Sequence, residues 1–308
     1  MAIYQNITQI IGTTPLVRLQ RLGEHYGCHG ELYGKCEFLN PTGSLKDRAA
    51  MGILQDAAAR GELSSKSTVV CLSGGSGGVA AAMACACIGL PCIIVASDNI
   101  TLRCLRHIRA YGAKVLMTPS RDGLDGMKKK AAQIAAQTPD CFILNQFEDE
   151  GNPRASKTTT GPELIRDLPD IDYLVAGIGT GGSLTGTAEH IKMLRPDCVV
   201  VGVEPLDSPV LSGGLPGTHS LTGIGLGFVP KVLNRYILDQ VIRVRTPDAM
   251  TVMRRLATLE GMLCGPSSGA ALMAAISIAQ DEACAGKKIA VLLPDRGEEY
   301  LDRDIYGK

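Results

Sequence analysis

Short apolar runs alternate along the chain with segments in which apolar residues recur at helical spacing. Runs rich in β-branched residues predict strands at 68–72, 92–96, 114–118, 141–145, 173–176, 198–203 and 288–293. The segments between them predict helices at 47–60, 79–88, 102–111, 123–137, 184–194, 247–260 and 268–280. The apolar residues of these strands are mostly continuous rather than alternating, which is typical of parallel strands buried on both faces. We therefore expect an α/β protein in which mainly parallel sheets are flanked by helices.

Two stretches interrupt this alternation. Polar and acidic residues at 146–153 mark the place where we expect a boundary between two domains, the number that 308 residues suggests. Residues 208–230 show no clear period. A loop of that length inside a compact domain is usually functional.

The charge balance excludes two classes of partner. The chain has 31 basic and 31 acidic side chains, so its formal net charge is zero. It lacks the basic stretch with which proteins bind nucleic acid or an anionic membrane surface. The uncharged stretch at 67–97 is cut by glycines and a proline into pieces too short to cross a bilayer. We therefore expect no nucleic-acid partner and no membrane span.

The cysteines indicate a reducing environment. There are 11 of them, most lie within apolar runs, and no C-x-x-C pair occurs. Reduced cysteines that pack as small hydrophobic side chains explain this usage best. The opening MAIYQNITQI has no features of a signal peptide, and the five histidines lack metal-ligand spacing. A cytoplasmic protein without a metal site is the expectation.

Glycine is unusually frequent, with 36 residues, and many of them form clusters at 73–78, 177–183, 213–227 and 265–269. The first two clusters each lie between a predicted strand and a predicted helix. Glycine-rich turns in that position let backbone N–H groups converge on an anion at a helix N-terminus. Two such turns in one chain favour a phosphate or carboxylate ligand over simple tight turns.

One cluster also resembles a dinucleotide-binding fingerprint. Gly177, Gly179 and Gly182 satisfy G-x-G-x-x-G after a strand, and Glu204 follows at about the distance of the acid that binds ribose. This turn lies beyond the middle of the chain, whereas the fingerprint normally opens the first βαβ unit. NAD-dependent redox chemistry is kept as an alternative.

A single lysine carries the strongest chemical signal. Lys46 follows a Pro-Thr-Gly-Ser turn and falls in the first turn of a predicted helix, where a cation opposes the helix dipole. A residue that breaks a local rule in this way often has a function. A lysine held there beside apolar walls has a lowered pKa and forms Schiff bases readily.

With Lys46 in this context, the chain resembles the cysteine synthase (O-acetylserine sulfhydrylase) family of fold-type II pyridoxal-phosphate enzymes, almost from end to end. The similar motifs are at 11–19, 41–48, 146–147, 157–163, 179–183, 208–214, 223–230 and 265–269. The resemblance implies two domains, each a mainly parallel twisted sheet flanked by helices. Residues 36–146 would form the N-terminal domain, and residues 1–35 with 147–308 the C-terminal domain. It also implies pyridoxal phosphate as cofactor and a homodimer.

The resemblance also implies roles for individual residues. Lys46 would hold the cofactor as a Schiff base and act as general base, and Ser267 would contact the pyridine nitrogen. The cofactor phosphate would be bound by a loop that explains the dinucleotide-like pattern, namely Gly179, Thr180, Gly181, Gly182 and Ser183. The substrate would be bound by Ser73, Ser76, Gln146 and Gly223.

The first glycine cluster departs from the family pattern Thr-Ser-Gly-Asn-Thr-Gly. Leu72 replaces a threonine expected to contact the substrate carboxylate, and Gly75 replaces an asparagine expected to contact the cofactor's phenolic oxygen. Each lost hydrogen bond to a charged group is worth about 1.5–3 kcal/mol. Arg103 also stands where many relatives carry an acid. We therefore expect ordinary cysteine synthase activity to be slowed by one or more orders of magnitude.

The resemblance implies β-replacement on an activated serine such as O-acetylserine by sulfide or a related nucleophile, through an aminoacrylate, forming cysteine or a β-substituted alanine. Two alternatives remain. One is β-elimination on the same cofactor, as in a serine dehydratase or cysteine desulfhydrase. The other is a catalytically weakened paralogue that regulates a partner.

Overall fold

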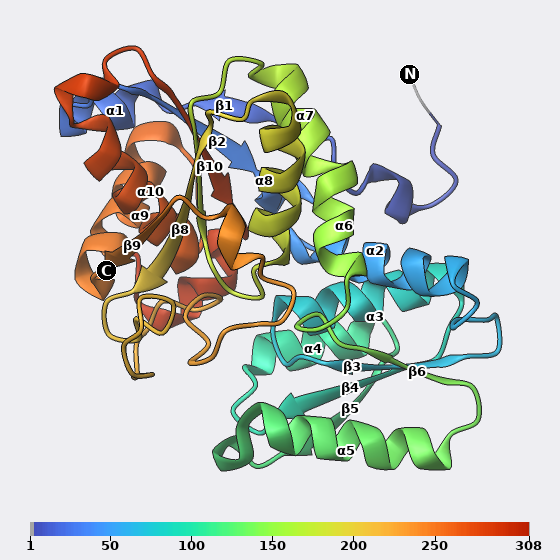
Figure 1. Ribbon diagram of the computed structural model, residues 1–308. Coiled ribbons are helices and arrows are strands. Elements are labelled where there is room, and N and C mark those ends of the chain that lie inside the picture. The colour runs from blue at the N-terminus through green and yellow to red at the C-terminus, as the bar shows by residue number, and fades with distance from the viewer. Residues whose placement is uncertain (1–2, 308) are drawn as a thin grey trace.

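The computed structural model describes residues 3–307, which fold around two sheets (Figure 1). The smaller sheet has the order β5–β4–β3–β6, and its strands are β3 (Thr68–Leu72), β4 (Cys92–Ser97), β5 (Lys114–Thr118) and β6 (Cys141–Leu144). All three strand pairs in it are parallel. Its two faces are covered by α2 (Lys46–Ala59), α3 (Ser76–Ile88) and α4 (Leu102–Ala110) on one side and α5 (Gly123–Gln137) on the other.

The larger sheet has the order β1–β2–β10–β7–β8–β9. Its strands are β1 (Leu16–Arg18), β2 (Glu31–Cys36), β7 (Tyr173–Gly177), β8 (Val199–Pro205), β9 (Gln240–Val244) and β10 (Lys288–Leu293), and only the edge strand β1 runs antiparallel to its neighbour. One face packs on α1 (Gln20–Tyr26), α9 (Thr246–Glu260) and α10 (Pro266–Ala279), the other on α7 (Thr160–Asp167) and α8 (Gly182–Leu194).

Helix α6 (Gly151–Thr158) connects the two halves, because it packs on α2 from the smaller sheet and on α8 from the larger one. Short 3-10 helices complete the fold: η1 (Ile7–Ile10), η2 (Glu37–Leu39), η3 (Ser120–Asp122), η4 (Arg235–Ile237), η5 (Glu282–Cys284) and η6 (Gly297–Arg303). Of the helices described for residues 3–307, none combines the length and the apolar character that crossing a bilayer requires.

The predicted α/β class is confirmed, and each of the fourteen predicted strands and helices is present with ends shifted by a few residues. Helices α3 and α8 begin earlier than predicted, because their first turns contain glycines that count against a helix in sequence reasoning. The periodic pattern missed β1, α1, β2, α6, α7 and β9. Residues 206–234 contain no helix or strand, as predicted. The domain limits at residues 36 and 146 stay a prediction.

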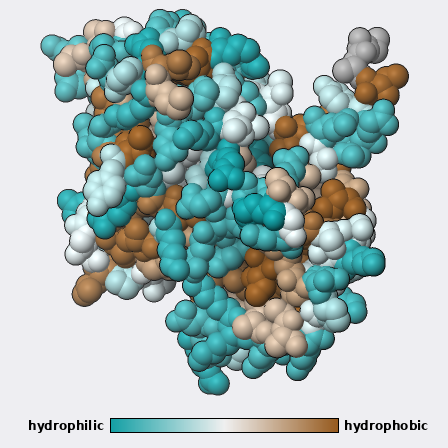
Figure 2. Space-filling model, turned by 45° about the vertical axis from the view of Figure 1, so that its right-hand side comes forward, coloured by the Kyte–Doolittle hydropathy of each residue, from teal (hydrophilic) through white to brown (hydrophobic). Residues whose placement is uncertain are grey.

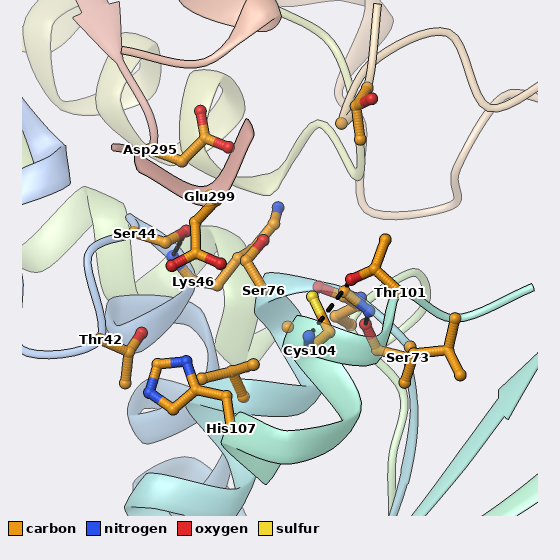
Figure 3. A pocket seen from close by; sticks show the side chains of 18 of the residues that line it. Thr42, Ser44, Lys46, Ser73, Ser76, Thr101, Cys104, His107, Asp295 and Glu299 are labelled. Atoms are coloured by element: carbon orange, nitrogen blue, oxygen red, sulfur yellow. Dashed lines mark hydrogen bonds between the residues drawn. The ribbon is translucent and has the colours of Figure 1, made fainter. Parts of the chain in front are cut away.

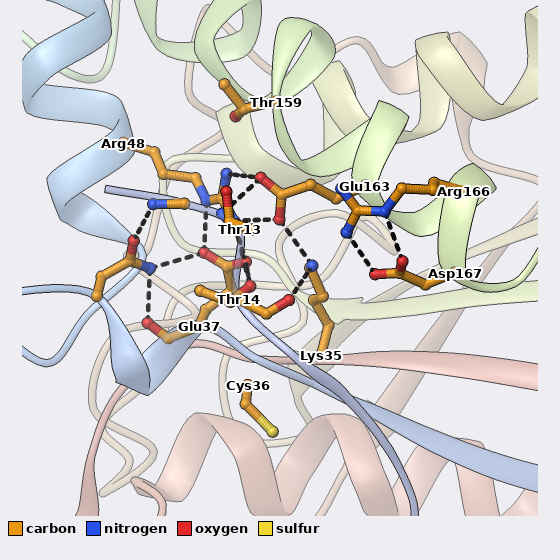
Figure 4. A network of polar contacts seen from close by, with 12 residues as sticks. Thr13, Thr14, Lys35, Cys36, Glu37, Arg48, Thr159, Glu163, Arg166 and Asp167 are labelled. Atoms are coloured by element: carbon orange, nitrogen blue, oxygen red, sulfur yellow. Dashed lines mark hydrogen bonds and ion pairs between the residues drawn. The ribbon is translucent and has the colours of Figure 1, made fainter. Parts of the chain in front are cut away.

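A buried network of charged side chains joins the two halves near the start of α2 (Figure 4). The Arg48 guanidinium donates to both carboxylate oxygens of Glu37 at 2.7 and 2.8 Å and to both of Glu163 at 2.7 and 2.8 Å. The Lys35 ammonium, fully buried, donates to Glu163 at 2.7 Å and to the Thr14 carbonyl at 2.5 Å. The network therefore ties β2, α2 and α7 together.

The network keeps the carboxylate of Glu163 charged although it is largely buried. Burial alone would raise the pKa of Glu163, but the hydrogen bonds and charges of Arg48 and Lys35 outweigh it and lower that pKa to about 2. A buried ion pair adds little net stability when complete, yet removing one partner leaves the other charge uncompensated. The pairing thus makes the position of α2 hard to change.

We expect Glu163→Gln to lower the free energy of unfolding by about 3–5 kcal/mol, because the buried Lys35 would lose its counter-charge and Arg48 would keep only Glu37. Urea denaturation measures the loss. Glu62→Gln is the control, since Glu62 pairs with Arg60 at the surface and such pairs contribute about 0–1 kcal/mol.

The difference in unfolding free energy between wild type and Glu163→Gln should depend on pH. Because the pKa of Glu163 is lowered in the folded chain, its contribution is present above the unfolded value of about 4.5 and is lost as the pH falls toward 2. The difference between wild type and Glu163→Gln should therefore shrink in acid. A loss no larger than that of Glu62→Gln at neutral pH contradicts the assigned role.

Candidate active site

A hollow lies where the carboxyl ends of β3, β7 and β10 face one another. A cavity of about 380 Å³ adjoins a narrower one of about 50 Å³. Both are lined by Ser44, Lys46, Ser76, Thr180, Gly223 and Asp295. In parallel α/β sheets, ligands bind beyond the carboxyl ends of the strands, so the position is that of a binding site.

Lys46 extends into this hollow from the first residue of α2 (Figure 3). The turn before it is held in place, because the Leu45 N–H donates to the Pro294 carbonyl at 2.8 Å and the Ser44 hydroxyl accepts the Lys46 N–H at 3.2 Å. Burial lowers the pKa of Lys46 to about 8, although the charge of Asp295 opposes the shift. A sizeable fraction of the amine is therefore neutral near neutral pH and able to act as a nucleophile or base.

Asp295 is a member of the site that sequence reasoning missed. It lies two residues beyond the end of β10, accepts a hydrogen bond from the Tyr300 hydroxyl at 2.5 Å, and its carboxylate lies 3.5 Å from the Ser267 hydroxyl. Burial raises the pKa of Asp295 to about 6, against the opposing effects of Tyr300 and Lys46. An acid two residues beyond the apolar run 289–293 was the available signal in the sequence.

The 179–183 loop forms the floor of the narrower cavity. Glycines are required here, because a side chain at Gly179 would meet the Gly223 carbonyl at 2.2 Å and one at Gly181 would meet Leu233 at 2.7 Å. Gly181 also has a φ of +83°. Asn152 donates to the Thr180 hydroxyl at 3.2 Å and so supports the loop from α6.

The loop has the chemistry of an anion site. Within the described part of the chain, the backbone N–H groups of residues 179–184 find no acceptor. They gather at the N-terminus of α8, where the helix dipole favours negative charge. The residues present therefore fit the phosphate of the cofactor that the resemblance implies, and Lys46 lines the same cavity.

Most of the predicted substrate residues line the larger cavity. Ser73, Ser76 and Gln146 line it together with Gly223, which has a φ of +95°. Gln146 is buried and packs so close to Gly77 that a side chain there would meet its amide at 2.9 Å. Ser267 lines the narrower cavity. Gly182, the first residue of α8, is buried against Asn152 and lines neither cavity.

Two placements differ from expectation. Leu72 lines neither cavity, and its buried side chain packs with Val70 and Val95 toward α5, so the predicted substrate contact is not formed. Strand alternation explains this, because Leu72 and Ser73 point to opposite sides. Glu204 does not face a nucleotide site. Its carboxylate instead accepts hydrogen bonds from Leu211 and Ser212 at 2.6–3.0 Å and holds the long loop.

The mouth of the larger cavity carries further residues that the motifs did not identify. Glu299, Tyr300 and Arg303 reach it from η6, and His107 from α4. Arg103, noted from the sequence only as a departure, pairs with Glu299 at 3.0 Å. No local pattern brings α4 and η6 together, so only the folded chain reveals this rim.

Comparison with known proteins gives a consistent result. The family model described as "Pyridoxal-phosphate dependent enzyme" matches residues 7–295. A probable cysteine synthase of Bacillus subtilis is 42% identical over 99% of both chains. The crystal structure of a cysteine synthase from Entamoeba histolytica superposes with a TM-score of 0.95 at 32% identity, covering 99% of this chain and 91% of that one. An O-acetylserine dependent cystathionine beta-synthase from Helicobacter pylori gives 0.92 at 34% identity over the whole of both chains.

The lowered pKa of Lys46 predicts how the reaction of its amine with an aldehyde depends on pH. Only a neutral amine condenses with an aldehyde, so adduct formation with pyridoxal phosphate should rise with pH around a midpoint near 8, the folded pKa. An ordinary lysine would show a midpoint of about 10.4. The absorbance of the adduct follows the reaction, and borohydride reduction with peptide mapping locates it.

Lys46→Ala should abolish the adduct, whereas Lys129→Ala, which changes an exposed lysine of α5, should leave it intact. An adduct that persists in Lys46→Ala, or a midpoint near that of an ordinary lysine, contradicts the assignment.

Proposed function

Because the chain belongs to the pyridoxal-phosphate dependent enzyme family, we propose that it catalyses β-replacement on an activated serine of the O-acetylserine type. Sulfide or a related nucleophile would replace the leaving group, and the product would be cysteine or a β-substituted alanine. The observation that carries the proposal is a half-buried Lys46 in one cavity with a glycine-rich anion cradle. The cysteine synthase relatives supply the substrate class.

The cofactor, when bound, supplies an aldehyde that condenses with amines and a ring that accepts electrons from the substrate Cα. Lys46 would hold it through the amine, the 179–183 loop would hold its phosphate, and Ser267 would face its ring nitrogen. Once the substrate amine has taken its place, the Lys46 amine is free to remove the Cα proton, since its pKa of about 8 suits a base near neutral pH.

The substrate carboxylate would be bound by the segment from Ser73 to Ser76 together with Gln146. Ser76 begins α3, so the N-terminus of that helix faces the cavity and favours an anion. The Ser73 hydroxyl accepts the Gly75 N–H at 3.4 Å, a contact weak enough to exchange for a ligand. Gly223, from the long loop, would cover the substrate.

The proposal is tested by loading the protein with pyridoxal phosphate, adding O-acetylserine and sulfide, and measuring cysteine. Wild type should form cysteine, and Lys46→Ala should lose at least about a thousandfold in rate, because both the cofactor link and the base are removed. Pyruvate release without cysteine would instead indicate β-elimination. A bound cofactor whose spectrum does not change with O-acetylserine would indicate a regulatory paralogue and overturn the proposal.

The departure at Gly75 gives a second test. A side chain built at Gly75 meets nothing within 4 Å, and the backbone there, at the N-cap of α3, is extended. Asparagine fits both conditions and is a favoured N-cap residue. We expect Gly75→Asn to raise kcat/KM for O-acetylserine about tenfold by restoring a hydrogen bond to a charged group. Gly75→Ala is the control that adds a Cβ without an amide, and an equal effect of both variants would refute this reading.

We further propose a homodimer in a reducing compartment, with domains at 36–146 and at 1–35 plus 147–308. All 11 cysteines are free thiols in the structure, which supports the compartment. The N-terminal segment projects from the body (Figures 1 and 2) and exposes Ile3, Tyr4, Ile7 and Ile10. Such an apolar arm favours a partner surface, and a second copy is the family expectation. Sedimentation equilibrium distinguishes dimer from monomer.

A further inference from the structure

The rim of the larger cavity carries a cation that the proposed reaction does not use. Arg303 lies at the end of η6, and its side chain lines the cavity together with Tyr300 and Thr222. Its guanidinium lies 5.4 Å from the centre of the Tyr300 ring and 3.4 Å from the Thr222 hydroxyl. Within residues 3–307 no carboxylate lies within ion-pair distance of it.

The surroundings hold Arg303 ready for a ligand. Tyr300 is itself fixed by its hydrogen bond to Asp295, so the ring beneath the guanidinium is a stable support. The nearest acid on η6 that lines the cavity, Glu299, is already paired with Arg103 at 3.0 Å. Within residues 3–307, no carboxylate therefore pairs with Arg303.

From these contacts we propose that Arg303, with the Thr222 hydroxyl, forms a subsite for a second anionic group of the substrates, additional to the α-carboxylate. A guanidinium presents a planar fork of donors that matches a carboxylate or a phosphate. The anion is either a carboxylate on the thiol nucleophile or a phosphate ester as leaving group on the serine. This inference rests on the proposed function, because it names which members of that substrate class the cavity takes.

The nucleophile arm compares mercaptopropionate with mercaptoethanol as acceptors, each with O-acetylserine. The two thiols differ by a carboxylate in place of a hydroxyl. Arg303→Gln should raise the KM for mercaptopropionate about tenfold and leave the KM for mercaptoethanol unchanged. Tenfold is the low end for a hydrogen bond to a charged group, because Arg303 is exposed to solvent. Arg303→Lys should keep part of the preference for mercaptopropionate over mercaptoethanol, since lysine retains the positive charge but lacks the paired donors of a guanidinium.

The serine arm compares O-phosphoserine with O-acetylserine as donors, with mercaptoethanol as the common acceptor. A selective loss of O-phosphoserine in Arg303→Gln identifies the anion as a leaving group, and a selective loss of mercaptopropionate identifies it as part of the nucleophile. Arg109→Gln is the matched control, because Arg109 is an exposed arginine of α4 that does not line the cavity.

A binding measurement separates failure of this inference from failure of the proposed function. Phosphonoalanine carries its phosphonate directly on Cβ, without the ester oxygen of O-phosphoserine, and so has no leaving group. Calorimetric titration of the cofactor-loaded protein with it therefore needs no turnover. Its affinity should exceed that of alanine in wild type and fall about tenfold in Arg303→Gln. If no donor reacts yet this difference persists, the proposed function fails and the subsite stands. The subsite is refuted if Arg303→Gln changes none of three quantities. These are the ratio of KM values for the two thiols, the ratio of rates with the two serine donors, and the affinity for phosphonoalanine.

Discussion

The buried ion pairs of Arg48 determine where the chemistry takes place. Arg48 and Lys46 lie two residues apart in the first turn of α2, so they point in different directions from the same helix. Arg48 is fixed by Glu37 beside β2 and by Glu163 on α7, both anchored to the larger sheet. Charges held in a low-dielectric interior tolerate little displacement, because each depends on its partner. The start of α2, and with it Lys46, is therefore held at the junction of the two sheets.

The cavity follows from how the two sheets face each other. Loops at the carboxyl ends of parallel strands meet there, and glycine lets them approach closely. At Gly179 the missing side chain leaves room for the Gly223 carbonyl from the long loop. The same absence of side chains exposes the N–H groups at the start of α8. Close approach and anion binding thus have one structural cause.

The charged groups of the cavity differ between its interior and its mouth. Lys46 and Asp295 line the same cavities, and burial lowers the pKa of Lys46 to about 8 and raises that of Asp295 to about 6. At the mouth, Glu299 pairs with Arg103, and none of the described carboxylates pairs with Arg303. The interior groups are suited to moving protons, and the outer arginine is suited to selecting an anion.

The sequence by itself determined the elements and the local motifs. Period and apolar runs are properties of neighbouring residues, so they predicted strands such as 68–72 and 288–293 correctly, and Lys46 stood out because it opposes its own helix dipole. Tertiary structure decided what depends on residues far apart in the chain. It showed that Leu72 points away from the cavity, that Glu204 supports a loop, and that Asp295 lines the same cavity as Lys46. The pairing of Arg103 with Glu299 joins residues almost two hundred positions apart, and only chain folding, which no local pattern encodes, brings them together.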